Sequence, residues 1–295
     1  MDFEQMRERI ATGQGFIAAL DQSGGSTPKA LRGYGVEDDA WSGEDEMFGL
    51  IHEMRQRIIE SPCFGNGKVI GAILFEKTMD GQSGGKSVPA RLAERGIVPF
   101  LKVDKGLEDE RDGAQLMKPN PGLEDLCNRA RELGVFGTKM RSVIKANNTQ
   151  GIKEAVRQQF AEGARILSCG LVPILEPEYD ITASDRAEGE KILLEAIEEG
   201  LDALPEGQQV MLKLSIPKQA GLYSDLTRHP KVLRVVALSG GYSTEEACAE
   251  LARNPGMIAS FSRGLLQDLR AQQDDDEFDR TLSSAIDRIS AASAT

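Results

Sequence analysis

The sequence predicts an α/β protein in which eight parallel strands alternate with helices and close into a (β/α)8 TIM barrel. Two observations support this prediction. Eight short apolar runs recur along the 295 residues, and amphipathic helical patterns separate most of them. In addition, no Pro-rich or low-complexity stretch divides the chain. We therefore expect one catalytic domain that covers residues 1–295.

The expected strands follow one another at intervals that suit right-handed crossovers between parallel strands. They are residues 16–21, 68–75, 98–104, 136–141, 171–178, 209–215, 234–240 and 257–263. The expected helices are residues 44–60, 87–95, 123–133, 152–166, 187–201 and 244–253. An open doubly wound sheet is the main alternative, but the segment after the first strand lacks the GxGxxG spacing of that fold.

Four further segments have weaker patterns. Residues 107–121 predict a long loop, and the acidic run at residues 274–277 predicts a solvated helix start. Residues 289–295 are mostly small and polar, and we expect them to fray. Residues 81–87 (GQSGGKS) resemble a P-loop but are one residue short of its spacing, so they predict a turn and a helix start.

Composition excludes several classes of function. No apolar run is long enough to cross a bilayer, and the N-terminus lacks the pattern of a signal peptide, so we expect a cytoplasmic protein without a membrane partner. A net charge of −12 disfavours a nucleic-acid partner. The chain has four scattered cysteines without a CxxC pair, which predicts reduced thiols: Cys63, Cys127, Cys169 and Cys248.

Histidine is scarce, because His52 and His229 are the only two in the sequence. Both lie in charged stretches that suggest surface positions. A His-rich metal site or a Ser-His-Asp triad would have to use one of them. We therefore predict no metal site.

Charged side chains occur near the C-terminal ends of most expected strands. They are Asp21, Lys102, Lys139, Arg141, Glu176, Glu178 and Lys213. Residues i and i+2 of a strand face the same side, so Lys139 shares a face with Arg141, as Glu176 does with Glu178. An unpaired charge buried beneath a helix costs several kcal/mol. We expect these groups to point instead into the C-terminal mouth, where the active sites of this fold lie.

Lys213 is the sharpest candidate, because it interrupts the otherwise apolar residues 210–214. A lysine among apolar walls and other cations tends to be neutral, and a neutral amine can attack a carbonyl to form an imine. Glu176 and Glu178 could supply proton transfer beside it. The alternatives stay open: Lys213 could be a structural partner of a buried carboxylate, and the glutamates could balance Lys139 and Arg141.

Two turns have the composition of phosphate sites. Ser239, Gly240 and Gly241 follow the seventh expected strand, and Ser262 and Arg263 follow the eighth. Backbone N–H groups at helix starts bind phosphate, and in barrels they often do so at these two positions. Ordinary turns and helix caps would look similar.

A second cluster of candidate phosphate ligands follows the first and third expected strands: Ser23, Ser26, Lys29 and Lys102. An N-cap with solvated lysines would also explain it. Two such regions on opposite sides of Lys213 suggest a substrate with phosphate at both ends.

Seven motifs occur in one order along the chain: AALDQSGGS, FLKVDKG, TKMRSVIK, VPILEPE, LKLS, LSGGYS and SFSRG. Together they resemble the class I fructose-bisphosphate aldolases, especially the shorter bacterial members. The resemblance implies a carbon–carbon lyase of glycolysis or gluconeogenesis. Such an enzyme reversibly cleaves fructose 1,6-bisphosphate to dihydroxyacetone phosphate and glyceraldehyde 3-phosphate through a lysine Schiff base. It needs no metal or other cofactor.

The resemblance also implies catalytic roles for individual residues. Lys213 would form the Schiff base with C2 of the ketose, and Glu176 would be the main general acid–base. Asp21 would bind the C4 hydroxyl and assist cleavage of the C3–C4 bond. Lys139 and Arg141 would bind substrate and tune Lys213. The remaining catalytic carboxylate, Glu178, would support Lys139.

For the substrate's phosphates, the resemblance implies one site on each side of Lys213. Ser239, Gly240 and Arg263 would hold the C1 phosphate, with Gly241 and Ser262 in the same two turns. The C6 phosphate would contact the three candidates of the second cluster that bind substrate in the family: Lys102, Ser23 and Ser26.

Three features depart from the animal enzymes. Ser262 replaces a glycine, which changes how Arg263 reaches the phosphate. The sequence ends in Ser-Ala-Thr rather than in the tyrosine that animal enzymes use in proton exchange, and LKLSIP replaces LLKPN. Another group would therefore have to manage the enamine proton.

Two other kinds of protein fit the same residues less well. One is another Schiff-base barrel lyase, of the transaldolase or deoxyribose-phosphate aldolase type. The other is a non-catalytic barrel that binds phosphosugars. The sequence leaves open the oligomeric state, although homo-oligomers are common in the family. It also leaves open the physiological direction and the selectivity between bisphosphate and monophosphate ketoses.

Overall fold

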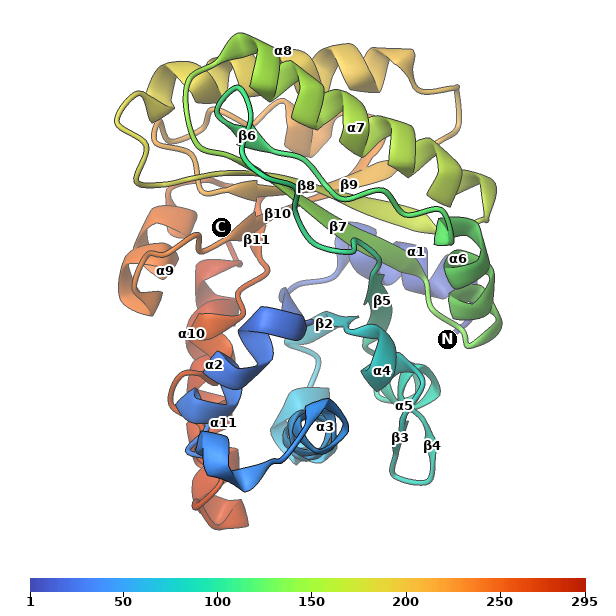
Figure 1. Ribbon diagram of the computed structural model, residues 1–295, viewed down its shortest axis with the longest axis vertical. Coiled ribbons are helices and arrows are strands. Elements are labelled where there is room, and N and C mark those ends of the chain that lie inside the picture. Colours follow the sequence, from blue (N-terminus) through green and yellow to red (C-terminus); the bar gives the residue numbers. More distant parts are fainter.

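The computed structural model describes the backbone of residues 1–295 and the surroundings of every residue except Gly24. Its main sheet has eight parallel strands in the order β1-β2-β5-β7-β8-β9-β10-β11. The last strand contacts the first, so the barrel is nearly closed. Helices surround these strands (Figure 1). The predicted (β/α)8 TIM barrel is therefore confirmed.

All eight expected strands form, with shifts of a few residues at their ends. They are β1 (Phe16–Leu20), β2 (Val69–Leu74), β5 (Val98–Lys102), β7 (Gly137–Ile144), β8 (Val172–Tyr179), β9 (Val210–Ser215), β10 (Val232–Leu238) and β11 (Ile258–Ala259). Two short hairpin strands, β3 (Gln82–Ser83) and β4 (Lys86–Ser87), form the turn expected at residues 81–87. Within the expected loop at 107–121, β6 (Ala114–Gln115) pairs antiparallel with β7.

The six expected helices also form. They are α3 (Glu44–Glu60), α5 (Val88–Glu94), α6 (Leu123–Glu132), α7 (Thr149–Ser168), α8 (Arg186–Ala203) and α9 (Thr244–Ala252). The acidic run at residues 274–277 begins α11 (Asp275–Ala292), as expected. Four helices were not predicted: α1 (Phe3–Thr12), α2 (Thr27–Gly33), α4 (Glu76–Met79) and α10 (Arg263–Leu266). The 3-10 turns are η1 (Gly24–Ser26), η2 (Asp38–Ala40), η3 (Pro62–Gly65) and η4 (Leu226–Arg228).

The expectation that residues 289–295 fray was wrong. Helix α11 continues to Ala292, and Ile289 is fully buried. The Ser293 hydroxyl accepts a hydrogen bond of 2.9 Å from the backbone N–H of Ala259, and Ser293 itself is buried. These contacts attach the end of α11 to β11, the shortest strand of the barrel.

Apolar side chains fill the N-terminal half of the barrel interior. Helix α1 places Met6 and Ile10 beneath the strands, where they join the interior side chains of Ile17, Phe100 and Met211, among others. Strand side chains alternate between interior and exterior, so the next interior position along each strand lies closer to the C-terminal mouth. The apolar interior thus ends where the charged residues begin.

Candidate active site

The charged candidate residues occupy the next interior position after the apolar core, toward the C-terminal end of each strand. Lys213 lies two residues after Met211, and Lys102 lies two residues after Phe100. The parallel pairing also brings neighbouring strands into register, with Lys102 opposite Lys139 and Arg141 opposite Glu176. The alternation and the register together place these side chains at similar heights in the mouth, as the sequence predicted.

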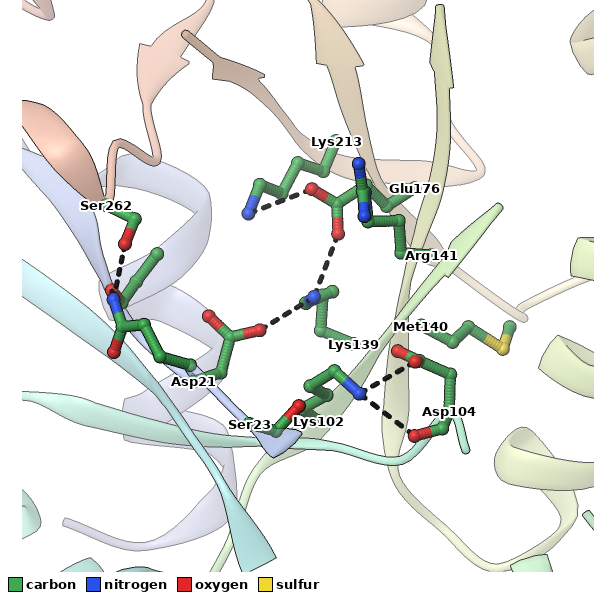
Figure 2. Close-up of polar contacts among 12 residues, drawn as sticks. Asp21, Ser23, Lys102, Asp104, Lys139, Met140, Arg141, Glu176, Lys213 and Ser262 are labelled. Atoms are coloured by element: carbon green, nitrogen blue, oxygen red, sulfur yellow. Dashed lines mark hydrogen bonds and ion pairs between the residues drawn. The ribbon is translucent and has the colours of Figure 1, made fainter. Parts of the chain in front are cut away.

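Four side chains, three buried and one largely buried, form a continuous chain of ion pairs (Figure 2). The Lys213 Nζ lies 3.1 Å from Glu176 Oε1, and Glu176 Oε2 lies 3.0 Å from Lys139 Nζ. The same Lys139 Nζ lies 2.7 Å from Asp21 Oδ2. At most 11% of any of these four side chains is exposed. Glu176 therefore contacts the candidate amine and a second lysine at once.

The charges in this chain stabilise one another. Burial by itself would raise the pKa of Asp21, but the positive charges of Lys139 and Lys213 lower it well below its ordinary value. Burial would lower the pKa of Lys139, but the carboxylates of Asp21 and Glu176 raise it well above its ordinary value. Lys139 therefore stays a cation and Asp21 stays a carboxylate across the physiological pH range.

Two further ion pairs flank this chain. Arg141 donates from Nε to Glu178, so Glu178 pairs with Arg141 and not with Lys139 as we expected. The carboxylate that contacts Lys139 is that of Glu176. Lys102 donates to the side chain of Asp104 at 2.7 Å and to its backbone carbonyl at 2.9 Å. Asp104 was not among the predicted site residues.

A cavity of about 550 Å3 opens beside Lys213 and reaches both predicted phosphate turns. It is lined by Gln22, Ser26, Lys29, Ala30, Gly33, Met54, Glu176, Glu178, Lys213, Leu238, Ser239, Gly240, Gly241, Ser260, Ser262, Arg263, Leu266, Gln267 and Arg270. The lining brings nine of the predicted site residues together and adds Ser260, Gln267 and Arg270. The cavity wall does not include Ser23 or Lys102, although Ser23 and Ser26 hydrogen-bond to each other.

A larger hollow, of about 690 Å3, lies between residues 107–118 and the start of α7. Its wall contains five carboxylates and only two cationic side chains: Glu108, Asp109, Glu110, Asp112 and Glu154, with Arg111 and Lys118. An acidic wall repels phosphate, and none of the strand-end residues lines it. The smaller cavity is therefore the candidate active site.

The turn after β10 has the backbone of an anion site. Gly240 and Gly241 have φ angles of +60° and +118°, which favour glycine, and a Cβ at Gly240 would lie 3.0 Å from Ile181 Cγ2. Two residues later, Ser243 caps α9 through the N–H of Glu246. The Gly240–Gly241 backbone can therefore approach a phosphate closely, next to a helix N-terminus.

Two further residues at this site, Arg55 and Gln22, were not predicted from the sequence. Arg55 of α3 is 1% exposed and donates to the backbone carbonyl of Gln22 at 2.6 Å. The amide of Gln22 in turn contacts Ser262. Arg55 falls in a charged helical stretch, and its sequence surroundings gave no signal that it is buried.

These features define a (β/α)8-barrel protein whose mouth holds a buried amine, a carboxylate in contact with it, and an open cavity lined by two small-residue turns. The model of the family described as fructose-bisphosphate aldolase class-I matches residues 3–213. That match covers more than half of the chain, so the chain belongs to this family of aldolases. The matched segment ends at Lys213, and the turns after β10 and β11 lie beyond it.

Solved structures share the fold. The chain is similar to fructose-bisphosphate aldolase from Plasmodium falciparum, with 20% identity, a TM-score of 0.78, and coverage of 99% of this chain and 94% of that one. That aldolase was solved with TRAP and a small-molecule inhibitor. Cgl0159 from Corynebacterium glutamicum is also similar, with 13% identity, a TM-score of 0.54, and coverage of 98% and 92%. At these identities the similarity establishes the barrel fold.

Two features are absent from the described residues. None of the described helices is long and apolar enough to span a membrane. Within the same part of the chain, no three His, Cys, Asp or Glu side chains gather where they could hold a metal ion. All four cysteines are free thiols, and Cys127 and Cys169 are buried.

Proposed function

We propose that the protein is a cytoplasmic class I fructose-bisphosphate aldolase that acts in glycolysis or gluconeogenesis. It cleaves fructose 1,6-bisphosphate reversibly to dihydroxyacetone phosphate and glyceraldehyde 3-phosphate. One observation carries the proposal: the Lys213 amine lines an open cavity and lies 3.1 Å from a Glu176 carboxylate oxygen. A nucleophile in contact with its proton-transfer partner is the arrangement that imine formation needs.

Imine formation uses Lys213 and Glu176. The neutral amine attacks the C2 carbonyl of the ketose, and Glu176 accepts a proton from the nitrogen as the C–N bond forms. The same carboxyl passes this proton to the C2 alkoxide, which gives a carbinolamine. It then takes up a second proton from solvent and donates it to the C2 hydroxyl, which leaves as water and gives the protonated imine. Lys139, a permanent cation 3.0 Å from the other oxygen of Glu176, orients this carboxyl.

Cleavage of the carbon–carbon bond uses Asp21. The Asp21 carboxylate, which Lys139 keeps ionised, removes the proton of the C4 hydroxyl. The electron pair of the C3–C4 bond then moves into the protonated imine, which becomes an enamine, and the aldehyde leaves. Protonation of the enamine and hydrolysis of the imine release the ketone product and restore the Lys213 amine.

The phosphate groups set the position of the sugar relative to Lys213. The C1 phosphate contacts the Gly240–Gly241 turn, Ser239, Ser262 and Arg263, which line one side of the cavity. The C6 phosphate contacts Ser23, Ser26 and Lys102, and Lys102 must then exchange one of its contacts with Asp104 for the phosphate. Arg141, held by Glu178, contacts the sugar between them.

A substrate panel tests this proposal. The purified protein is incubated with fructose 1,6-bisphosphate, fructose 1-phosphate, fructose 6-phosphate and 2-deoxyribose 5-phosphate, and the release of triose phosphate or acetaldehyde is measured. We expect the largest kcat/KM with the bisphosphate, and no loss of rate with a chelator. Preference for deoxyribose phosphate, or loss of activity with the chelator while the protein remains folded, would contradict the proposal.

A further inference from the structure

Arg55 is a buried cation that is held by neutral groups. It is 1% exposed, and among the described residues it makes no salt bridge. Its guanidinium donates to Thr78 Oγ1 at 2.7 Å, to the Gln22 backbone carbonyl at 2.6 Å and to Gln22 Oε1 at 3.3 Å. Burial lowers its pKa to about 10, although the nearby Asp21 charge opposes this shift. Burying a charge without a carboxylate partner costs free energy, and the contacts of Arg55 show what this cation does for the structure around it.

The contacts of Arg55 fix which way the Gln22 amide points. A guanidinium can only donate hydrogen bonds, so the atom of Gln22 that faces Arg55 must be the carbonyl oxygen Oε1. The amide nitrogen then points the other way, where it donates to the Ala19 backbone carbonyl at 3.2 Å and to the Ser262 hydroxyl. Ser262 Oγ is therefore an acceptor in this contact, and its own hydrogen is left to donate elsewhere.

That hydrogen is available at the cavity. Gln22, Ser262 and Lys213 line the same cavity wall, and Figure 2 shows Ser262 on a different side of the site from Lys213. Ser260 lines this cavity too, and it is 2% exposed. Across the part of the chain that is described, its hydroxyl has no hydrogen-bond partner. The wall before Arg263 thus offers two hydroxyl groups with unused hydrogen-bonding capacity.

We propose that Arg55 and Gln22 are positioning residues that orient the Ser262 hydroxyl to donate to a phosphate oxygen of the substrate. The identity of that phosphate, on C1 of the ketose, rests on the proposed function. The relay runs from the Arg55 guanidinium to Gln22 Oε1, and from Gln22 Nε2 to Ser262 Oγ. Ser262 then adds a donor that a glycine at this position would lack. The buried Arg55 cation thus helps this part of the cavity wall to bind an anion.

The test measures binding without catalysis, so it can fail independently of the aldolase assay. Inorganic phosphate is titrated calorimetrically into the wild-type protein and into Ser262→Ala, Gln22→Leu and the double variant. A hydrogen bond to a charged acceptor corresponds to a loss of about tenfold in affinity, and we expect it in each single variant. Ser262→Ala removes the donor, and Gln22→Leu acts only through that donor. We therefore expect the double variant to bind no more weakly than Ser262→Ala.

Two further variants make the outcome decisive. Gln22→Glu keeps a side chain of the same shape, but its carboxylate would accept the Ser262 hydrogen and repel phosphate, so we expect a larger loss than for Gln22→Leu. Ser224→Ala, in a turn that does not line the cavity, is the matched control and should bind phosphate as the wild type does. In kinetics, Ser262→Ala should raise KM while kcat stays within about twofold.

Phosphate affinity unchanged in Ser262→Ala would overturn the proposal, as would additive losses in the double variant. If Gln22→Leu does not fold, the comparison of Gln22→Glu with Ser262→Ala decides, because Gln22→Glu must then weaken phosphate binding at least as much. A Gln22→Glu variant that folds and binds phosphate like the wild type would also overturn the proposal.

Discussion

Two clusters of buried charge in this molecule look alike and do different things. In the mouth, Lys213 and Glu176 are 4% and 3% exposed. Beside it, Arg186 and Glu190 of α8 are 3% and 0% exposed, with Arg186 Nε 2.6 Å from Glu190 Oε1. Both clusters place a cation next to a carboxylate out of contact with bulk water. Burial and pairing alone therefore cannot tell which cluster performs chemistry.

The remaining hydrogen bonds separate the two clusters. Arg186 also donates to the backbone carbonyl of Ile216, and Glu190 accepts from the Lys218 N–H at 2.8 Å, so this pair holds the loop after β9. Neither residue lines the cavity, whereas Lys213 and Glu176 do. The comparison teaches that access to an open, polar cavity, rather than burial of charge, marks the candidate catalytic pair.

The largest expected effect is that of removing the amine. In Lys213→Met, no imine can form, so we expect cleavage of fructose 1,6-bisphosphate to fall to the background rate. Met keeps much of the apolar volume, and Glu176 retains Lys139 as a partner, so the thermal midpoint should stay close to that of the wild type. Steady-state kinetics and thermal unfolding measure both. Substantial residual activity in a folded variant would remove Lys213 from the mechanism.

The second effect concerns proton transfer. Glu176→Gln keeps the size of the side chain but cannot exchange a proton, and we expect kcat to fall by about 10² to 10⁴-fold. Initial rates with saturating substrate measure this. A fall of less than about tenfold would mean that Glu178 or another group carries the protons.

For the Arg186–Glu190 pair, we expect a mutation to lower stability and to leave kcat nearly unchanged. Glu190→Gln leaves the Arg186 cation buried without its carboxylate, and we expect the free energy of unfolding to drop by about 3–5 kcal/mol. Urea unfolding measures this loss, and kcat at a temperature where the variant is folded should stay within a few-fold of the wild type. A large loss of kcat without a loss of stability would make this pair part of the active site.

The smallest effect is in the pH dependence of stability. The pKa of Asp21 is lowered in the folded protein, because the lysine charges outweigh burial. Its stabilising contribution is therefore full above the ordinary carboxylate pKa of about 4 and is lost as the pH falls below it. Burial raises the pKa of Glu190, and Arg186 only partly opposes this shift. The stability that Glu190 gives to the folded protein is therefore lost as the pH rises above the ordinary carboxylate pKa of about 4.

Urea unfolding between pH 4 and 8 separates these two contributions. The difference in unfolding free energy between wild type and Asp21→Asn should be constant from about pH 5 to pH 8. The difference between wild type and Glu190→Gln should fall as the pH rises above about 4, and each proton limits the slope to about 1.4 kcal/mol per pH unit. Equal slopes for both variants would show that the two clusters do not differ electrostatically.

The barrel could be predicted because it depends on local patterns. Every expected strand formed, since runs of apolar residues at regular spacing determine both the strands and their order. The ends of the strands were harder to predict, because they depend on contacts with segments distant in the sequence. Strand β7 extends to Ile144 because β6 pairs with its last residues. Strand β11 stops at Ala259, and Ser260 after it lines the cavity wall.

The site was predictable in position but not in its pairings. Strand alternation and register brought Lys213 and Glu176 to the mouth, and both facts follow from residue spacing. Which carboxylate meets which cation depends on side-chain packing across strands, so the sequence left open which glutamate pairs with Arg141 and which with Lys139. Arg55 was missed because the group that it contacts, the Gln22 carbonyl, lies 33 residues away in the chain.

Borohydride trapping tests the central claim most directly. The protein is incubated with fructose 1,6-bisphosphate and sodium borohydride, and the intact and digested protein are examined by mass spectrometry. The imine mechanism predicts a reduced covalent adduct on the peptide that contains Lys213, and no adduct in Lys213→Met. An actively cleaving protein that yields no adduct, or an adduct that persists in the Lys213→Met variant, would contradict it.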